Sequence, residues 1–124
     1  MHTRYTDIPP YQAPDGSQIR ELMHPDEHPV QRQSLAEATI LPGEATQLHR
    51  HHVSEELYHV VAGQGLMILG EECFDVAVGD TVLIPPGTAH RIANAGSEPL
   101  RILCACSPAY SHADTELLIG PGGQ

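Results

Sequence analysis

The stretch that decides the fold is residues 43–63, GEATQLHRHHVSEELYHVVAG. Side chains along a β-strand alternate between its two faces, so His49 and His51 project to the same face if this segment is extended. After a short turn, Glu56 opens an apolar strand, and strand pairing can bring its carboxylate beside both imidazoles. The stretch therefore predicts a pocket into which two histidines and one carboxylate point.

A second stretch, GDTVLIPPGTAH at residues 79–90, supplies a third histidine. The apolar residues 82–84 predict a buried strand, and the Pro-Pro-Gly after it predicts a turn, so His90 begins the next strand. Three imidazoles and one carboxylate are a ligand set of divalent transition metals. We predict one such metal per chain, held by His49, His51, Glu56 and His90. These ligands suit Zn, Mn, Fe, Ni, Co or Cu, so the metal's identity stays open.

The two stretches together resemble the two signature motifs of the cupin superfamily. The first motif is Gly, five residues, His-x-His, three or four residues, Glu, six residues and Gly, matched here at Gly43, His49, His51, Glu56 and Gly63. The second is Gly, five residues, Pro-x-Gly, two residues, His, three residues and Asn, matched at Gly79, Pro85, Gly87, His90 and Asn94. The short spacing between the motifs is similar to that of bacterial-type members, including sequences loosely labelled mannose-6-phosphate-isomerase-like.

The resemblance implies an all-β fold, a single antiparallel jelly-roll barrel (a double-stranded β-helix) with the metal inside its open end. A chain of 124 residues is large enough for one core and too small for two. We expect residues 1–18 to form an extended, Pro-rich arm, residues 19–119 the barrel and residues 120–124 a flexible tail. The resemblance leaves the reaction open, because cupins include isomerases, dioxygenases, decarboxylases, storage proteins and sugar-sensing domains.

Turn signals outside the two motifs predict further local structure. Residues 62–65 are expected to form the tight turn of a β-hairpin whose return strand is residues 66–69. Residues 114–119 fit either a short strand or a short helix. His24 and His28 each precede a proline, which disfavours helical geometry, so we interpret both as solvated loop residues.

Charge and cysteine content restrict the partners and the compartment. The six basic residues are all Arg and face sixteen acidic residues, a formal net charge of −10, which opposes binding to nucleic acid or to acidic membranes. No stretch reaches the about 18 apolar residues that span a bilayer. Three cysteines in a chain without an export signal favour reduced thiols and a cytoplasmic location. Cys73, Cys104 and Cys106 are expected to be small core residues, the alternative being that one reaches the metal or acts as a nucleophile.

Other side chains are candidates for the walls of the pocket. Gln47 shares a face with His49 and His51, and Tyr58 shares one with Glu56, so either can bind substrate or simply pack. His52 and His59 fall on the outward face by the same alternation.

Two classes of function remain open on these residues. The first is a metal-dependent enzyme, of isomerase or dioxygenase type, acting on a small molecule. The second is a non-catalytic, metal-dependent binding or sensing module. The ligand should be an unphosphorylated carbonyl, carboxylate or diol compound, because alternation turns Arg50 and Arg91 away from the metal face and a buried phosphate needs such a cation. The Pro-rich arm and the outward Leu57 and Val61 predict a homodimer.

Overall fold

The computed structural model describes residues 1–118 and consists almost entirely of β-structure. One turn of 3-10 helix, η1 (Tyr5–Asp7), lies in the N-terminal arm. The strands in the described residues are β1 (Tyr11–Gln12), β2 (Gln18–Met23), β3 (Ser34–Ile40), β4 (His49–His51), β5 (Glu55–Ala62), β6 (Gln64–Leu69), β7 (Glu72–Ala77), β8 (Thr81–Ile84), β9 (His90–Ala93), β10 (Leu100–Ser107) and β11 (Thr115–Leu117).

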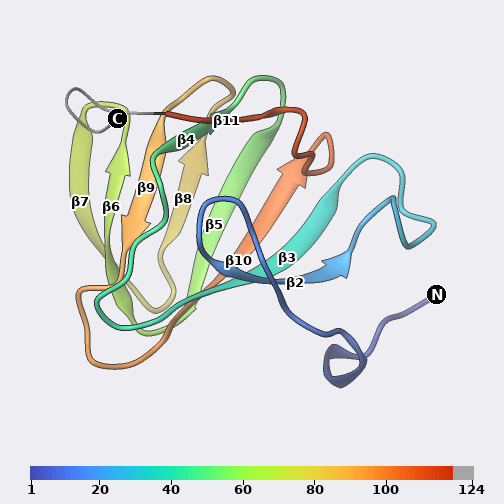
Figure 1. Ribbon diagram of the computed structural model, residues 1–124, viewed down its shortest axis with the longest axis horizontal. Coiled ribbons are helices and arrows are strands. Elements are labelled where there is room, and N and C mark those ends of the chain that lie inside the picture. The colour runs from blue at the N-terminus through green and yellow to red at the C-terminus, as the bar shows by residue number, and fades with distance from the viewer. Residues whose placement is uncertain (119–124) are drawn as a thin grey trace.

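The strands form two antiparallel sheets that enclose the core (Figure 1). The six-stranded sheet has the order β1-β2-β3-β10-β5-β8, and the five-stranded sheet has the order β11-β4-β9-β6-β7. This arrangement confirms the predicted all-β, antiparallel jelly-roll class. Because β4 and β9 belong to one sheet and β5 to the other, residues from both sheets can meet in the space between them.

The core is built from the inward positions of strands in both sheets. Along β10, buried residues alternate with more exposed ones, as expected for a strand with one face on the core. Ile84 and Ile102 from one sheet and Met67 and Ile92 from the other are at most 1% exposed and belong to one contiguous cluster. Burial of each such side chain contributes about 1.5–3 kcal/mol, so this contact holds the sheets together.

The predicted hairpin at residues 62–65 is wrong. The strands β5 and β6 on either side of this turn belong to different sheets, β5 pairing with β10 and β8, and β6 with β7 and β9. Gly63 has a φ of +81°, and a Cβ atom there would lie 2.6 Å from the carbonyl oxygen of Pro99. The glycine thus lets the chain cross from one sheet to the other rather than reverse within one.

The N-terminal arm packs against its own chain. The Oγ1 of Thr3 donates a hydrogen bond to the carbonyl of Leu22 at 2.8 Å, and the Oη of Tyr5 donates one to Glu37 at 2.5 Å. Further along, the short strand β1 pairs with β2. The arm is therefore partly ordered by β2 and β3 and contains a helical turn that its prolines do not prevent.

The structure also tests predictions for residues 114–119, His24 and Cys73. Residues 115–117 form a strand, β11, which pairs with β4, while residue 119 and the expected tail at residues 120–124 lie outside the described residues. His24 is buried rather than solvated, because its Nε2 atom hydrogen-bonds the carbonyl oxygen of Tyr110 at 2.7 Å. Cys73 is exposed rather than a core residue.

No helix within residues 1–118 is long and apolar enough to cross a membrane.

Candidate metal centre

Three histidines from two neighbouring strands converge on one point between the sheets. His49 and His51 are the inward residues of β4, and His90 begins the adjacent strand β9, where it pairs in register with His49. One ring nitrogen from each residue lies within 4.8 Å of the others, and all three residues are buried. The arrangement is one that a single metal ion can use.

Hydrogen bonds at Nδ1 orient the three rings. The Nδ1 of His49 lies 2.7 Å from the carbonyl oxygen of Gln47, and that of His90 lies 2.9 Å from the carbonyl oxygen of Thr88. A carbonyl can only accept, so each Nδ1 carries the proton and each Nε2 keeps its lone pair.

A hydroxyl group fixes the third ring, that of His51, in the same tautomer. Its Nδ1 lies 2.9 Å from the Oγ1 of Thr115, which itself donates to the carbonyl of Ser111 at 2.8 Å. Because the Thr115 proton is committed to that carbonyl, the Oγ1 accepts from His51. All three histidines therefore present an unprotonated Nε2, the form that binds a metal.

Glu56, from β5 of the opposite sheet, completes the group. Its Oε1 lies 3.2 Å from the Nε2 of His51 and 3.5 Å from the Nε2 of His90. Within residues 1–118, the Oε1 of Glu56 and the Nε2 of His90 are buried and have no hydrogen-bond partner. Buried polar atoms normally have one, so these two atoms fit a site in which a cation is their partner.

The ionisation of the group also favours a metal. Burial alone would raise the pKa of Glu56, but the close rings of His51 and His90 lower it to about 2. Burial, and then the neighbouring His90, lowers the pKa of His49 below its ordinary value of 6.5. At neutral pH the pocket thus holds an ionised carboxylate and a neutral His49 imidazole, as coordination requires.

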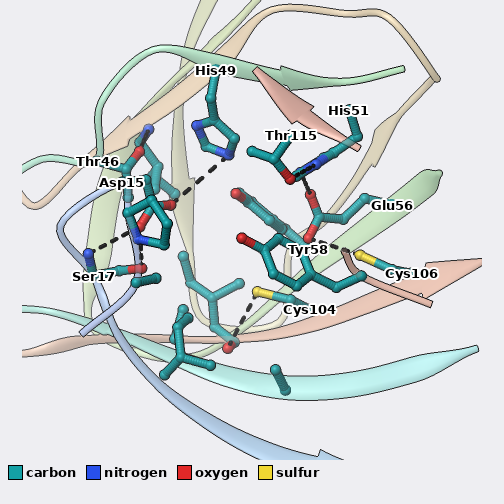
Figure 2. A pocket seen from close by; sticks show the side chains of 18 of the residues that line it. Asp15, Ser17, Thr46, His49, His51, Glu56, Tyr58, Cys104, Cys106 and Thr115 are labelled. Atoms are coloured by element: carbon teal, nitrogen blue, oxygen red, sulfur yellow. Dashed lines mark hydrogen bonds and ion pairs between the residues drawn. The ribbon is translucent and has the colours of Figure 1, made fainter. Parts of the chain in front are cut away.

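Three of the candidate ligands, His49, His51 and Glu56, line an internal cavity, shown in Figure 2. Apolar side chains from β3, β9 and β10 also line the cavity, among them Ala38, Ile40, Ile92 and Ile102. Polar side chains that line it are Tyr11, Asp15, Ser17, Glu21, Ser34, Thr46, Tyr58, Tyr110 and Thr115. The described residues that line the cavity include no Arg, so its charged groups are carboxylates and imidazoles.

The family of the chain follows from comparison with known proteins. A model described as a cupin domain matches residues 36–106, which contain both motifs. The chain belongs to the cupin family.

Several related proteins resemble this cupin over most of its length. MJ1618, an uncharacterized protein of Methanocaldococcus jannaschii, is 53% identical over 118 residues, 95% of this chain and 94% of that protein. Polyketide synthase CurC of Streptomyces cyaneus is 31% identical over 106 residues, 82% of this chain and 69% of that protein. The polyketide cyclase RemF from Streptomyces resistomycificus matches in structure with a TM-score of 0.82, covering 99% of this chain and 88% of that chain. At 18% identity, this last likeness shows the fold alone.

The two candidate wall residues of this cupin have different positions. Tyr58 is 5% exposed, lines the cavity and lies with its ring centre 5.9 Å from that of His90. Gln47 is exposed and does not line the cavity, whereas the preceding residue, Thr46, is buried and does. Residues 46–48 lie before β4 and are not paired as a strand, so the alternation that places His49 and His51 does not extend back to Gln47.

Two cysteines of this cupin lie beside the candidate ligands. Cys104 and Cys106 are buried and line the cavity, and the Sγ of Cys106 donates a hydrogen bond to the Oε2 of Glu56 at 3.3 Å. Burial, followed by the charge of Glu56, raises the pKa of Cys106. The group therefore remains a thiol that orients the carboxylate, and it is not a reactive thiolate.

Two residues at the site were not predicted from the sequence. Thr115 lies in β11, a segment whose pattern did not distinguish strand from helix, and it contacts His51 only because β11 pairs with β4. Asp15 lies in the arm, and its Oδ2 is 3.9 Å from the Nε2 of His49. No spacing pattern links either residue to the motifs, so only the fold reveals them.

Proposed function

We propose that this cupin is a metal-dependent enzyme that acts on a small, unphosphorylated carbonyl, carboxylate or diol compound, by an isomerase or dioxygenase type of reaction. The observation that carries the proposal is the set of three oriented Nε2 atoms beside the ionised Glu56, on the wall of a cavity. A bound divalent metal would supply Lewis acidity toward a substrate oxygen. His49, His51, Glu56 and His90 would hold it.

The charges around the cavity support an unphosphorylated substrate. A buried phosphate needs Arg, Lys or a helix N-terminus nearby, and the described cavity-lining residues provide none of them. Arg20 hydrogen-bonds the carbonyl of Ile8 and stacks over the ring of Tyr5 at 4.6 Å, outside the cavity. Arg50 pairs with Glu116 at 2.9 Å. Both guanidinium groups are therefore already engaged elsewhere.

Tyr58 can assist by donating a hydrogen bond to the substrate. Burial, and then the charge of Glu56, raises the pKa of its hydroxyl well above the ordinary value of 10. The hydroxyl consequently keeps its proton and can donate a hydrogen bond to a carbonyl oxygen in the cavity. The apolar side chains that line the cavity would exclude water from the carbon skeleton of the substrate.

One relative agrees with this substrate class. Its name, polyketide synthase CurC, refers to polyketides, which are carbonyl compounds. The odd number of thiols, free in the described residues, supports a reducing, cytoplasmic compartment as part of the same proposal.

Two experiments test the proposal. Protein purified without a tag under anaerobic conditions should contain a divalent metal, and oxygen uptake with candidate carbonyl and catechol compounds distinguishes dioxygenase from isomerase chemistry. Calorimetry on the metal-loaded protein should show that each unphosphorylated sugar or keto acid binds at least as tightly as its phosphorylated partner. Tighter binding of the phosphate in every pair, abolished by replacing one arginine, would contradict the proposed substrate class. Metal and ligand binding without turnover would instead support a binding or sensing module.

A further inference from the structure

The N-terminal arm places the carboxylate of Asp15, a residue outside both family motifs, beside the candidate metal centre. Asp15 lies in a tight turn over residues 13–17, in which the backbone N–H of Ala13 donates a hydrogen bond to the carbonyl of Ser17 at 2.9 Å and Gly16 has a φ of +95°. The carbonyl oxygen of Asp15 accepts a hydrogen bond from the backbone of Gln47 at 2.9 Å. Since the carbonyl of Gln47 orients His49, the backbone of Gln47 connects the arm to a candidate metal ligand.

The two oxygens of Asp15 have different surroundings. Its Oδ1 accepts hydrogen bonds from both the backbone nitrogen and the Oγ of Ser17, at 3.0 and 2.6 Å. Its Oδ2 lies 3.9 Å from the Nε2 of His49, beyond hydrogen-bond distance, and the side chain is 17% exposed. Ser17 therefore holds one oxygen in place while the other faces the metal position.

Asp15 and Glu56 reach the histidines from different sides, as Figure 2 shows. Glu56 lies nearest His51 and His90, whereas Asp15 lies nearest His49. Glu56 fits the role of ligand, because its Oε1 is buried with no hydrogen-bond partner in the described residues. Asp15 is more exposed and lines the same cavity.

We propose that Asp15 determines the charge selectivity of the site, disfavouring anionic ligands on the metal, carboxylates of the proposed substrate class included, and favouring neutral ligands that present a hydroxyl group, such as diols and water. The inference rests on the proposed metal site. A fixed negative charge a few ångströms from the metal position repels an anion there, in a partly buried setting where Coulomb energies exceed those in water. The free Oδ2 can also accept a hydrogen bond from a water or alcohol bound at the metal, which an anion such as azide cannot donate.

The test uses Co²⁺ and azide as probes, both followed by visible absorption. Asp15→Asn retains an oxygen that can accept both Ser17 hydrogen bonds, so the turn should persist while the charge is lost. We expect this variant to bind Co²⁺ less tightly and, once loaded, to bind azide about tenfold more tightly than the wild type. Asp75→Asn, which removes an exposed carboxylate on β7, is the matched control and should change neither affinity.

In Asp15→Asn, Co²⁺ affinity is expected to fall and azide affinity to rise. These opposite changes distinguish a charge effect from a loosened arm. Ser17→Ala removes one restraint on Asp15 and leaves its charge, so its azide affinity should stay close to that of the wild type. Azide binding that is unchanged or weakened in Asp15→Asn, or that rises equally in Ser17→Ala, would overturn the inference while leaving the proposed function standing. A wild-type protein that binds no Co²⁺ would overturn the proposed function, and the inference would fall with it.

Discussion

The Nδ1 of His51 lies 2.9 Å from the Oγ1 of Thr115, on a strand far along the chain from both motifs. Because Thr115 also donates to Ser111, it acts as the acceptor that fixes the proton of His51 on Nδ1. Outer partners of this kind typically change metal affinity 10–100-fold. The contact therefore gives β11 a role in the centre, beyond closing the edge of a sheet.

We expect Thr115→Val to lower metal affinity about tenfold while the protein stays folded. Valine keeps the shape of the side chain and removes the acceptor, so His51 can adopt the other tautomer or rotate. Thr81→Val is the matched control, because Thr81 contacts the Nδ1 of the outward His59 in the same way at 2.8 Å. Calorimetric titration with Zn²⁺ should separate the two variants, and equal affinities would argue that β11 does not orient His51.

Replacing the ligands themselves should have a larger effect. His49→Ala, His51→Ala and His90→Ala should each lower metal affinity by more than the 10–100-fold expected for an outer partner. Glu56→Gln keeps the shape and loses the charge, so its affinity should fall without vanishing. His52→Ala, at an exposed position beside the same strand, should bind metal like the wild type. Occupancy is measured by mass spectrometry and folding by circular dichroism, and full occupancy in any histidine-to-alanine variant would remove that residue from the ligand set.

Acidification should destabilise the metal-free protein in two ranges. The folded pKa of His49 lies below its ordinary 6.5, so the unfolded chain binds more protons and stability falls as pH drops through 6.5. The folded pKa of Glu56 is about 2 against an ordinary 4.5, so stability present above pH 4.5 is lost as pH falls toward 2. Denaturant unfolding with a chelator present measures both effects. In His49→Gln, the free energy of unfolding should depend less on pH in the first range. Wild-type stability that does not change between pH 7 and pH 5 would contradict this assignment.

An apolar row crosses the outer face of the six-stranded sheet and supports the proposed homodimer. Leu35, Ala105, Leu57 and Leu83 are consecutive cross-strand partners, and the three leucines are 38–51% exposed. We expect Leu57→Glu to weaken dimerisation about tenfold or more, whereas Val78→Glu, at an exposed site outside this row, should not. Light scattering at micromolar concentration provides the measurement, and a wild-type particle of 13.4 kDa would contradict the dimer.

Local alternation and motif spacing predict the fold class and also predict that the three histidines lie close together. Parity along β4 places His49 and His51 on one face, and the turn before His90 sets that residue at the start of β9. The same alternation fails for Gln47, because residues 46–48 do not pair as a strand. A pattern rule holds only where the backbone is extended and paired, and the sequence alone does not mark that limit.

Contacts between distant segments could not be predicted from the sequence. The turn at Gly63 has the composition of a hairpin, yet its flanking strands β5 and β6 belong to different sheets and the backbone of Pro99 approaches it closely. Asp15 reaches His49 only because the arm folds back over its own chain. In each case the deciding interaction is tertiary, so local sequence carries no signal for it.

The most direct test of the account is the metal content of the wild-type chain and of its His90→Ala variant. Both proteins would be purified without a tag, reconstituted with divalent metals under reducing conditions, freed of excess metal and analysed by inductively coupled plasma mass spectrometry. The account predicts one divalent transition metal per chain in the wild type and a sharp loss in the variant, with both proteins folded. A folded wild-type protein that remains metal-free would contradict it.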